Sequence, residues 1–508
     1  MAKASELKQW FEPLGGGMNQ KVEGAQIPFG EAKLLYNITH DNLGSWTSRK
    51  GITLAATTLV GTGGTQGLTS YLKLFGPNTV LYAGDRNLYF YNGVDTLTQI
   101  GADDQFQSGA KVNFCNFLNR AYIFSSSSAD IVKYTDGTSI FNLGSTTNQF
   151  SAKWGISAQN TLWIGGIASN PDRIYVSLYD EGNNTPTDQM WNDGQSFPTS
   201  TRFFTVDGAN TGMMSFKDQA YAFTDHSLWT FDIQSLEQFS GPQKRLDIGC
   251  VAHRTIAVDP KLGIAMWTDG KRGVYFWTGA GDPYNVAEKI TNYDDAVMDL
   301  IQDGNIAEMD ASIFDGKYFL SLGDLSNAGL SYYQDAQLVY DIAANKWSIR
   351  NTDMAALTSQ RVASGVVKLY GGSRDTLSLY EMEVESDVDQ DQGGNNVEIG
   401  GTIQTKDFGG EFGQIGDEKM WDEVRVAYSG TSDNVVVGFA LDGSDTYTDF
   451  FNLSAAVSNR DTRHKMLPRS CKSQTISLQF NWTSGTFKLL GLGLSVGVDT
   501  TTGKRPGS

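Results

Sequence analysis

The segment Val80-Leu-Tyr-Ala-Gly-Asp-Arg-Asn-Leu-Tyr-Phe-Tyr91 decides the fold, because it reads as two short strands joined by a tight turn. Its ends are rich in β-branched and aromatic side chains, which strands favour, and its middle holds turn formers. The same phrase recurs at residues 121–134, 174–178, 221–231, 264–277, 318–340 and 368–380. The sequence therefore predicts a series of β-hairpins.

These hairpins recur at a nearly regular interval. One residue near the start of each first run, at positions 81, 122, 175, 221, 264, 318 and 369, gives intervals of 41, 53, 46, 43, 54 and 51 residues. Repeats of about 40 to 50 residues that hold hairpins are typical of β-propeller blades. A ring of blades also buries sheet faces that one blade would leave in water. We expect six or seven blades over residues 25–395, after an N-terminal arm over residues 1–24.

The composition agrees with an all-β chain. Of 508 residues, 56 are glycine, and charged residues make up only 19%. A helical bundle or coiled coil would need more Ala, Glu, Lys and Leu. The sequence predicts one short helix at residues 292–302, where Val297, Leu300 and Ile301 share one face.

A change of pattern near residue 385 predicts a domain boundary. Residues 385–400 are acidic and rich in turn formers. Beyond them polar and apolar residues alternate, as in Glu423-Val-Arg-Val-Ala-Tyr428, which indicates strands with one buried face. We expect a β-sandwich over residues 400–497 and a flexible tail over residues 498–508.

The net charge is −18, and its distribution is uneven. Residues 401–508 hold 11 of the 39 basic and 12 of the 57 acidic residues, so the preceding part carries −17. A protein that grips nucleic acid over a broad surface carries the opposite sign. No stretch approaches the roughly 18 apolar residues of a transmembrane helix, so we expect no membrane span.

Residues that commonly carry catalysis are sparse and isolated. Four histidines lack metal-binding spacing: His40, His226, His253 and His464. Three cysteines form no CxxC pair and are expected to be buried thiols: Cys115, Cys250 and Cys471. The common nucleophile and phosphate-binding motifs are absent. We therefore predict no catalytic residue, no cofactor site and no metal site, and we interpret His226 as a turn residue.

One acidic motif leaves calcium binding open. Asp387, Asp389 and Asp391 are spaced like the start of a calcium loop, and Glu398 falls at the twelfth place. Gln392 stands where such a loop requires glycine. We therefore interpret the motif as an acidic linker.

Other carboxylates and aromatic residues have ordinary interpretations. The pairs Asp103–Asp104 and Asp294–Asp295, and the stretch from Glu411 to Glu418, read as loops or a helix start rather than as a glycosidase pair. Four tryptophans lie inside strand runs and are predicted to be blade core rather than a sugar-stacking surface: Trp229, Trp267, Trp277 and Trp347.

Several phrases, taken in order, resemble tail nozzle proteins (tail tube terminal proteins) of short-tailed bacteriophages. They include Gly15-Gly-Gly-Met-Asn19, Gly44-Ser-Trp-Thr-Ser-Arg-Lys-Gly51, Asn170-Pro-Asp-Arg-Ile-Tyr-Val-Ser177 and Thr405-Lys-Asp-Phe-Gly409. The resemblance covers almost the whole chain, and tail-hub proteins of long-tailed phages share similar phrases.

This resemblance implies a structural virion protein rather than an enzyme. It would be made in the host cytoplasm and would form a ring of subunits, usually a hexamer, in the virion tail. The ring would contact the portal, the adaptor and tail fibres, and double-stranded DNA would pass through it during ejection. An acidic ring would repel phosphates and so reduce friction on that DNA.

We further expect the long segments 181–200 and 441–463 to supply subunit or fibre contacts. Two alternatives remain. One is a carbohydrate-binding or polysaccharide-degrading propeller that faces the host surface. The other is an intracellular propeller scaffold, although the Trp-Asp blade ending of such scaffolds is missing.

Overall fold

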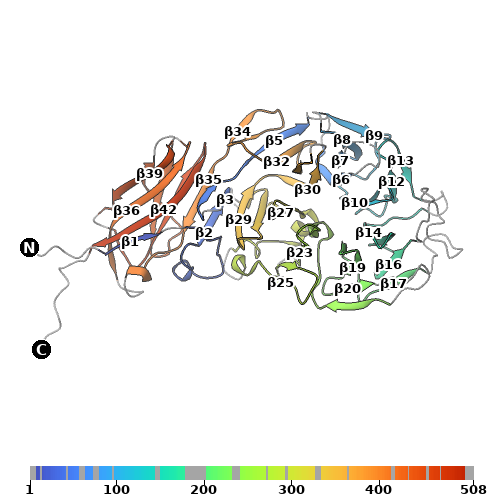
Figure 1. Ribbon diagram of the computed structural model, residues 1–508, viewed down its shortest axis with the longest axis horizontal. Coiled ribbons are helices and arrows are strands. Elements are labelled where there is room, and N and C mark those ends of the chain that lie inside the picture. The colour runs from blue at the N-terminus through green and yellow to red at the C-terminus, as the bar shows by residue number, and fades with distance from the viewer. Residues whose placement is uncertain are drawn as a thin grey trace, which may run out of the picture.

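The computed structural model describes residues 7–497, with gaps at 12–13, 42–43, 57–62, 72–78, 94–95, 144–148, 178–201, 232–240, 270–272, 292–295, 326–332, 363–364, 413–417, 433, 454–456 and 469–470. The described part is all-β apart from short helical turns (Figure 1). It contains a β-propeller and a second domain of two sheets.

Six blades of the propeller are separate sheets of four antiparallel strands. Five of them are built from consecutive strands. The first blade holds β6 (Thr65–Tyr71), β7 (Thr79–Gly84), β8 (Asn87–Tyr91) and β9 (Leu97–Ile100), the second holds β10 (Val112–Phe117), β11 (Arg120–Ser125), β12 (Lys133–Thr135) and β13 (Ile140–Asn142), and the third holds β14 (Trp154–Ala158), β15 (Thr161–Gly165), β16 (Arg173–Val176) and β17 (Phe203–Thr205). The fourth blade holds β18 (Gly212–Phe216), β19 (Gln219–Phe223), β20 (Leu228–Phe231) and β21 (Gln243–Leu246), and the fifth holds β22 (Ala257–Asp259), β23 (Ile264–Thr268), β24 (Val274–Trp277) and β25 (Tyr284–Asn285). The sixth joins β30 (Met354–Arg361), β31 (Val367–Ser373) and β32 (Leu379–Val384) to β5 (Gly51–Ala56) from near the N-terminus.

A seventh group of four strands completes the ring within a larger sheet. It consists of β26 (Asp310–Phe314), β27 (Lys317–Gly323), β28 (Ala336–Asp341) and β29 (Lys346–Asn351). Its first strand, β26, contacts β22 on one side and β30 on the other, and β30 contacts β6. The sequence predicted six or seven blades. The structure has six separate four-stranded sheets, and the four strands merged into the larger sheet form a seventh group.

Apolar clusters lie between neighbouring blades and hold the ring together. Phe124 and Ile164 share a cluster between the second and third blades, and Phe223 and Trp267 share one between the fourth and fifth. Each of these four side chains is fully buried. The alternating apolar residues of the strands therefore face adjacent blades, as a ring of radial sheets requires.

The ring is closed by pairing between the two ends of the propeller sequence. β5 runs antiparallel to β32, with Thr53 opposite Glu381 and Leu54 opposite Tyr380. The outermost strand of the last blade thus comes from the start of the chain. This pairing covers a strand edge that would otherwise be exposed.

The second domain combines strands from both ends of the chain. One sheet holds β1 (Leu7–Phe11), β3 (Ile38–His40), β4 (Trp46–Ser48), β36 (Lys419–Gly430), β39 (Val457–Met466), β40 (Lys472–Ser473) and β42 (Phe487–Gly497). The other holds β2 (Ala32–Tyr36), β35 (Gly401–Thr405), β37 (Val435–Leu441), β38 (Thr448–Leu453) and β41 (Ile476–Trp482). Both sheets contribute to one apolar core, which includes Trp46, Val426 and Phe480.

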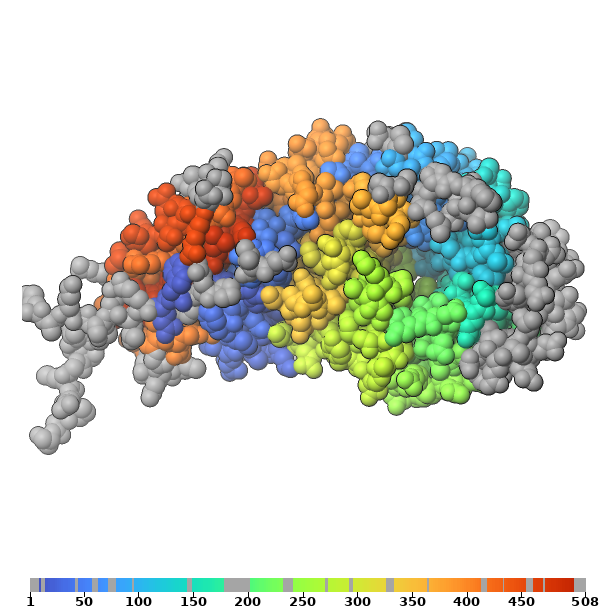
Figure 2. Space-filling view, viewed as in Figure 1, coloured from blue at the N-terminus to red at the C-terminus, as the bar shows by residue number. Residues whose placement is uncertain are grey.

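The N-terminal boundary differs from the sequence-based prediction. Residues 32–48 were expected in the propeller, but β2 pairs with β35, β4 pairs with β42, and β3 joins the same sheet through β4. The β2 strand contributes apolar side chains to both domains: Leu35 packs in the two-sheet core, while Leu34 packs in a propeller core cluster. β2 also pairs with β29 through Tyr36 and Ile349, so it joins the two domains in one nine-stranded sheet (Figure 1). The two domains lie along the long axis of the molecule (Figure 2).

Two local predictions are also wrong. Position 175, which was used as the start of a hairpin in measuring the repeat interval, lies in the third strand of its blade, β16. The second strand of that blade is β15. The predicted helix at 292–302 falls partly outside the described residues, and residues 297–300 form turns that bury Val297 and Met298. A short helix, α1 (Asp303–Glu308), follows instead, with a capping box between Gln302 and Asn305. The described residues also contain short 3-10 turns: η1 (Gly24–Gln26), η3 (His253–Thr255), η5 (Glu288–Ile290) and η7 (Gly410–Phe412).

The structure describes only one of the two long segments that were expected to supply subunit or fibre contacts. Residues 181–200 lie outside the described residues. Residues 441–463 supply β38 and most of β39, which are edge strands of the two sheets. The acidic stretch 385–400 contains a small hairpin of β33 (Val388–Gln390) and β34 (Asn396–Glu398).

Candidate functional site: the central channel

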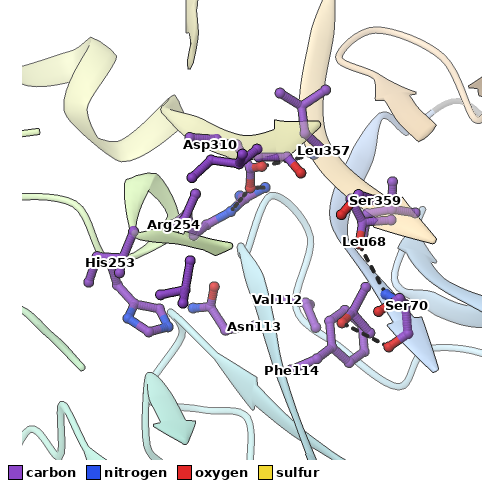
Figure 3. A pocket seen from close by; sticks show the side chains of 18 residues that line it. Leu68, Ser70, Val112, Asn113, Phe114, His253, Arg254, Asp310, Leu357 and Ser359 are labelled. Carbon is purple, nitrogen blue, oxygen red and sulfur yellow. Dashed lines mark hydrogen bonds and ion pairs between the residues drawn. The ribbon is translucent and has the colours of Figure 1, made fainter. Parts of the chain in front are cut away.

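A cavity of about 260 Å³ lies where the innermost strands meet. Its wall consists of residues 68–70, 112–114, 253–254, 256–258, 310–313 and 357–359 (Figure 3). These segments come from β6, β10, η3 with β22, β26 and β30. Five blade positions therefore contribute to one central channel.

An ion pair between Arg254 and Asp310 is the most buried charged contact of the wall (Figure 3). Nε of Arg254 donates to Oδ2 of Asp310 at 2.7 Å, and Nη2 donates to the carbonyl oxygen of Ala355 at 2.8 Å. The other carboxylate oxygen of Asp310 accepts from the backbone N–H of Leu357 at 2.8 Å. The side chains of Arg254 and Asp310 are 9% and 10% exposed. Burial raises the pKa of Asp310, although the Arg254 charge opposes this.

A second ion cluster lies nearby and involves Glu308. Its Oε2 atom is 2.5 Å from Nζ of Lys111 and 2.8 Å from Nη1 of Arg374. Burial opposes the charged form of Glu308, but Lys111 and Arg374 outweigh it and lower the pKa. Burial, with the Arg254 charge, lowers the pKa of Lys111. The ion pairs of the two clusters connect segments from four blades and so hold those blades together.

His253 is placed as a structural residue of the channel wall. Its ring stacks on Trp154 with centroids 5.3 Å apart, and its Nδ1 accepts the backbone N–H of Met213 at 3.2 Å. Burial lowers the pKa of His253 to about 3, so the ring is neutral near pH 7. Because the Nδ1 lone pair is already engaged, this histidine is poorly placed to accept a proton from a substrate.

The cysteines are all buried and unpaired, as expected. Burial raises the pKa of Cys250 to about 12, so its thiol is protonated at neutral pH. A protonated, buried thiol is a poor nucleophile. Among the channel hydroxyls, Oγ1 of Thr358 accepts the backbone N–H of Ser70 at 3.1 Å.

The acidic motif is built as a structural hairpin. Arg49 forms a two-pronged ion pair with Asp389, whose Oδ1 also accepts the backbone N–H of Ile52 at 3.0 Å. Asp391 accepts the backbone N–H groups of Gly393 and Asn395, each at 2.8 Å. Among the described residues, no group of three or more His, Cys, Asp and Glu side chains is arranged to hold a metal ion.

His226 lies in an exposed turn between β19 and β20. Its Nε2 is 3.2 Å from Oδ2 of Asp207, and its Nδ1 is 2.5 Å from Oδ1 of Asp225. The hydrogen bond to Asp225 raises the pKa of His226. The histidine therefore pairs with two carboxylates in a surface turn.

The tryptophan prediction holds for three of its four residues. Trp267, Trp277 and Trp347 are at most 1% exposed. Trp229 is only half-buried, and its Nε1 donates to Asp207 at 3.0 Å and to Ser227 at 2.8 Å.

The remaining carboxylates are separated. Asp103 and Asp104 are exposed, and Asp104 lies 3.0 Å from Arg86. Glu411 pairs with Lys406 at 2.5 Å, and Asp294–Asp295 lie outside the described residues.

Sequence reasoning missed the five charged residues of the two ion clusters in and beside the channel wall. They are spread over more than 260 positions: Lys111, Arg254, Glu308, Asp310 and Arg374. No local motif marks them.

Comparisons with known proteins leave the function open. No family model and no curated protein matches the chain. Among solved structures, similar folds include YCF48 bound to D1 peptide (11% identity, 66% of this chain and 97% of that chain, TM-score 0.38). YCF48 from Cyanidioschyzon merolae is similar over 65% of this chain and 98% of that chain (9% identity, TM-score 0.37). PorZ, a surface component of the type-IX secretion system of Porphyromonas gingivalis, is similar over 73% of this chain and 44% of its own (9% identity, TM-score 0.39). Likeness at this level carries no argument about function.

In the described part of the chain, no helix has the length and apolar character needed to cross a membrane.

Proposed function

We propose that the chain is a structural virion protein that forms the distal nozzle of a bacteriophage tail. Identical copies would close into a ring, with six copies as the expected number, and genomic DNA would leave through it. The sequence resemblance supports this assignment. The structural observation that supports it best is the acidity of one end of the propeller.

That acidic end follows from the strand order. Because adjacent strands are antiparallel, the turns between second and third strands lie at the same end as the connections between blades. Exposed aspartates gather in these loops: Asp103, Asp104, Asp225, Asp247, Asp299, Asp303, Asp324 and Asp375. Such a surface repels phosphates and would let DNA pass without being held.

The DNA passage must lie between copies of the chain. The cavity within one propeller is about 260 Å³, and the Arg254–Asp310 ion pair lies in its wall. Duplex DNA, whose major groove alone is about 12 Å wide, cannot enter such a space. We therefore propose that the acidic ends of several copies face a common lumen.

We also propose that the protein has no enzymatic activity. In the channel, the buried charges pair with one another, and His253 is neutral and hydrogen-bonded. A catalytic site would instead hold a nucleophile beside a base, or carboxylates with separated pKa values. The work of the protein would then lie in its contacts with the portal, the adaptor and the tail fibres.

Electron cryomicroscopy of the full chain, alone and with the portal and adaptor of the same phage, tests the proposal. We expect a closed ring of identical copies with the acidic loops lining the lumen. DNA release from particles that carry Asp103→Lys with Asp225→Lys should be slowed. The matched control, Asp136→Lys with Asp282→Lys, alters two exposed aspartates of the opposite propeller end and should release DNA normally.

Two results would contradict the nozzle. One is a chain that stays monomeric both alone and with the portal and adaptor. The other is a ring whose lumen is lined by other surfaces and whose DNA release is equally fast in both lysine variants.

A further inference from the structure

A second hollow, of about 700 Å³, lies between the propeller and the two-sheet domain. Its walls are the N-terminal segment around η1, the β35 and β41 strands, the turn after β37, and Ala296 and Tyr333 of the propeller part. Its volume falls within the range of about 300 to 1,000 Å³ that is typical of ligand sites. We call it the interdomain groove.

One wall of the interdomain groove is built from side-chain amides. Gln404 and Gln479 are directly opposite each other in β35 and β41. Their neighbours Ile403 and Phe480 are fully buried in the two-sheet core, so the two glutamines point to the other face of the sheet. Gln474, just before β41, adds a third amide to the groove.

These amides retain hydrogen-bonding capacity. Among the described residues, the side chains of Gln404 and Gln474 make no hydrogen bond, while Oε1 of Gln479 accepts from Nδ2 of Asn481 at 2.7 Å. Each free amide offers two donors and one acceptor. A ligand that both donates and accepts would therefore find matched partners along this wall.

The charges of the groove argue against an anionic ligand. Lys33 in the lining is engaged by Asp407, with Nζ 2.7 Å from Oδ1. Glu23, Asp442 and Asp445 add carboxylates, which would repel phosphates and acidic sugars.

A basic peptide would also find few free carboxylates at depth. Asp407 is already paired with Lys33, and Oδ1 of Asp442 accepts the backbone N–H groups of Gln474 at 2.7 Å and Thr475 at 3.2 Å. Glu23 and Asp445 are exposed, whereas Gln404 and Gln479 are half-buried, so these two amides are the main polar side chains of the more enclosed part of the wall.

We propose that the interdomain groove binds a neutral oligosaccharide. Sugar hydroxyls donate and accept hydrogen bonds, as the amides do, and carry no charge for the carboxylates to repel. This inference does not depend on the nozzle proposal, because it is argued from the amides and charges of the groove alone.

Isothermal titration calorimetry of the full chain tests the inference. The probes are neutral oligosaccharides of hexose and N-acetylhexosamine units, with polysialic acid and heptalysine as the anionic and basic comparisons. We expect one neutral class to bind. Gln404→Ala with Gln479→Ala should weaken that binding by about tenfold, the loss expected when two hydrogen bonds disappear.

Gln243→Ala is the matched control, because Gln243 is an exposed glutamine of the outermost strand β21. It should bind as the original chain does, and thermal unfolding should show that both variants are folded. Three results would overturn the inference: no neutral oligosaccharide binds at millimolar concentration, heptalysine or polysialic acid binds instead, or the double variant binds with unchanged affinity.

Discussion

Arg254 and Asp310 join two blades at the propeller axis, with Nη2 of the arginine 2.6 Å from Oδ2 of the carboxylate. Arg254 also reaches Ala355 and Asp310 also accepts from Leu357, so one pair fixes β26 and β30 to the connection before β22. The charged side chains of the channel wall therefore link one blade to another.

Replacing one partner of this pair should destabilise the ring strongly. Asp310→Ala leaves Arg254 buried without its carboxylate, and breaking a buried pair costs about 3 to 5 kcal/mol. Chemical denaturation followed by tryptophan fluorescence measures the loss. Arg254→Met with Asp310→Leu should recover most of the stability, since an apolar pair leaves no buried charge. Equal losses in both variants would show that the ion pair itself is needed.

The Asp389 interaction distinguishes a structural hairpin from a calcium site. Asp389→Ala removes the partner of Arg49, whose side chain is only 2% exposed, and should cost about 3 kcal/mol. Because this loss comes from an ion pair, a chelator should not change the melting temperature of the original chain. A rise in melting temperature on addition of calcium, absent in Asp389→Ala, would instead establish the calcium site.

Ring closure can be tested at Thr53. The backbone N–H groups of Ile52 and Leu54 point to Asp389 and Gln390, so by alternation the N–H of Thr53 faces β32. Thr53→Pro removes that hydrogen bond and should lower the melting temperature by several degrees, whereas Thr53→Val should have little effect. Increased proteolysis after β32 in the proline variant alone would report the opened ring.

The Asp335 carboxyl predicts a pH dependence of stability. Burial first, and then the charges of Asp353 and Asp324, raise the pKa of Asp335 to about 6. The folded state therefore binds this proton more tightly than the unfolded state. The contribution is favourable at low pH and is lost as pH rises through about 6.

Asp335→Asn should remove this loss, and asparagine tolerates the positive φ of 47° found at this position. Relative to the original chain, the variant should gain about 1 kcal/mol above pH 7, a value reduced for solvent screening because Asp335 is half-exposed. Urea unfolding at pH 5 and pH 8 measures the difference. A gain that is the same at both pH values would assign it to another cause.

The blade pattern was predictable because it is local. Each hairpin joins strands a few residues apart, and turn residues such as Asp85 and Arg86 between β7 and β8 leave a clear mark in the sequence. The buried tryptophans follow from the same strands. At position 175 the prediction chose the wrong strand, because β15 and β16 are both short apolar runs.

The amino-acid sequence by itself determined the all-β class and the propeller hairpins, since these depend on composition and short-range alternation. Only the tertiary structure decided that residues 32–48 belong with the C-terminal strands, that β5 closes the ring, and that Arg254 meets Asp310. Such pairings join segments from 56 to more than 430 residues apart, and their register is set by the packing of the whole molecule rather than by any local pattern.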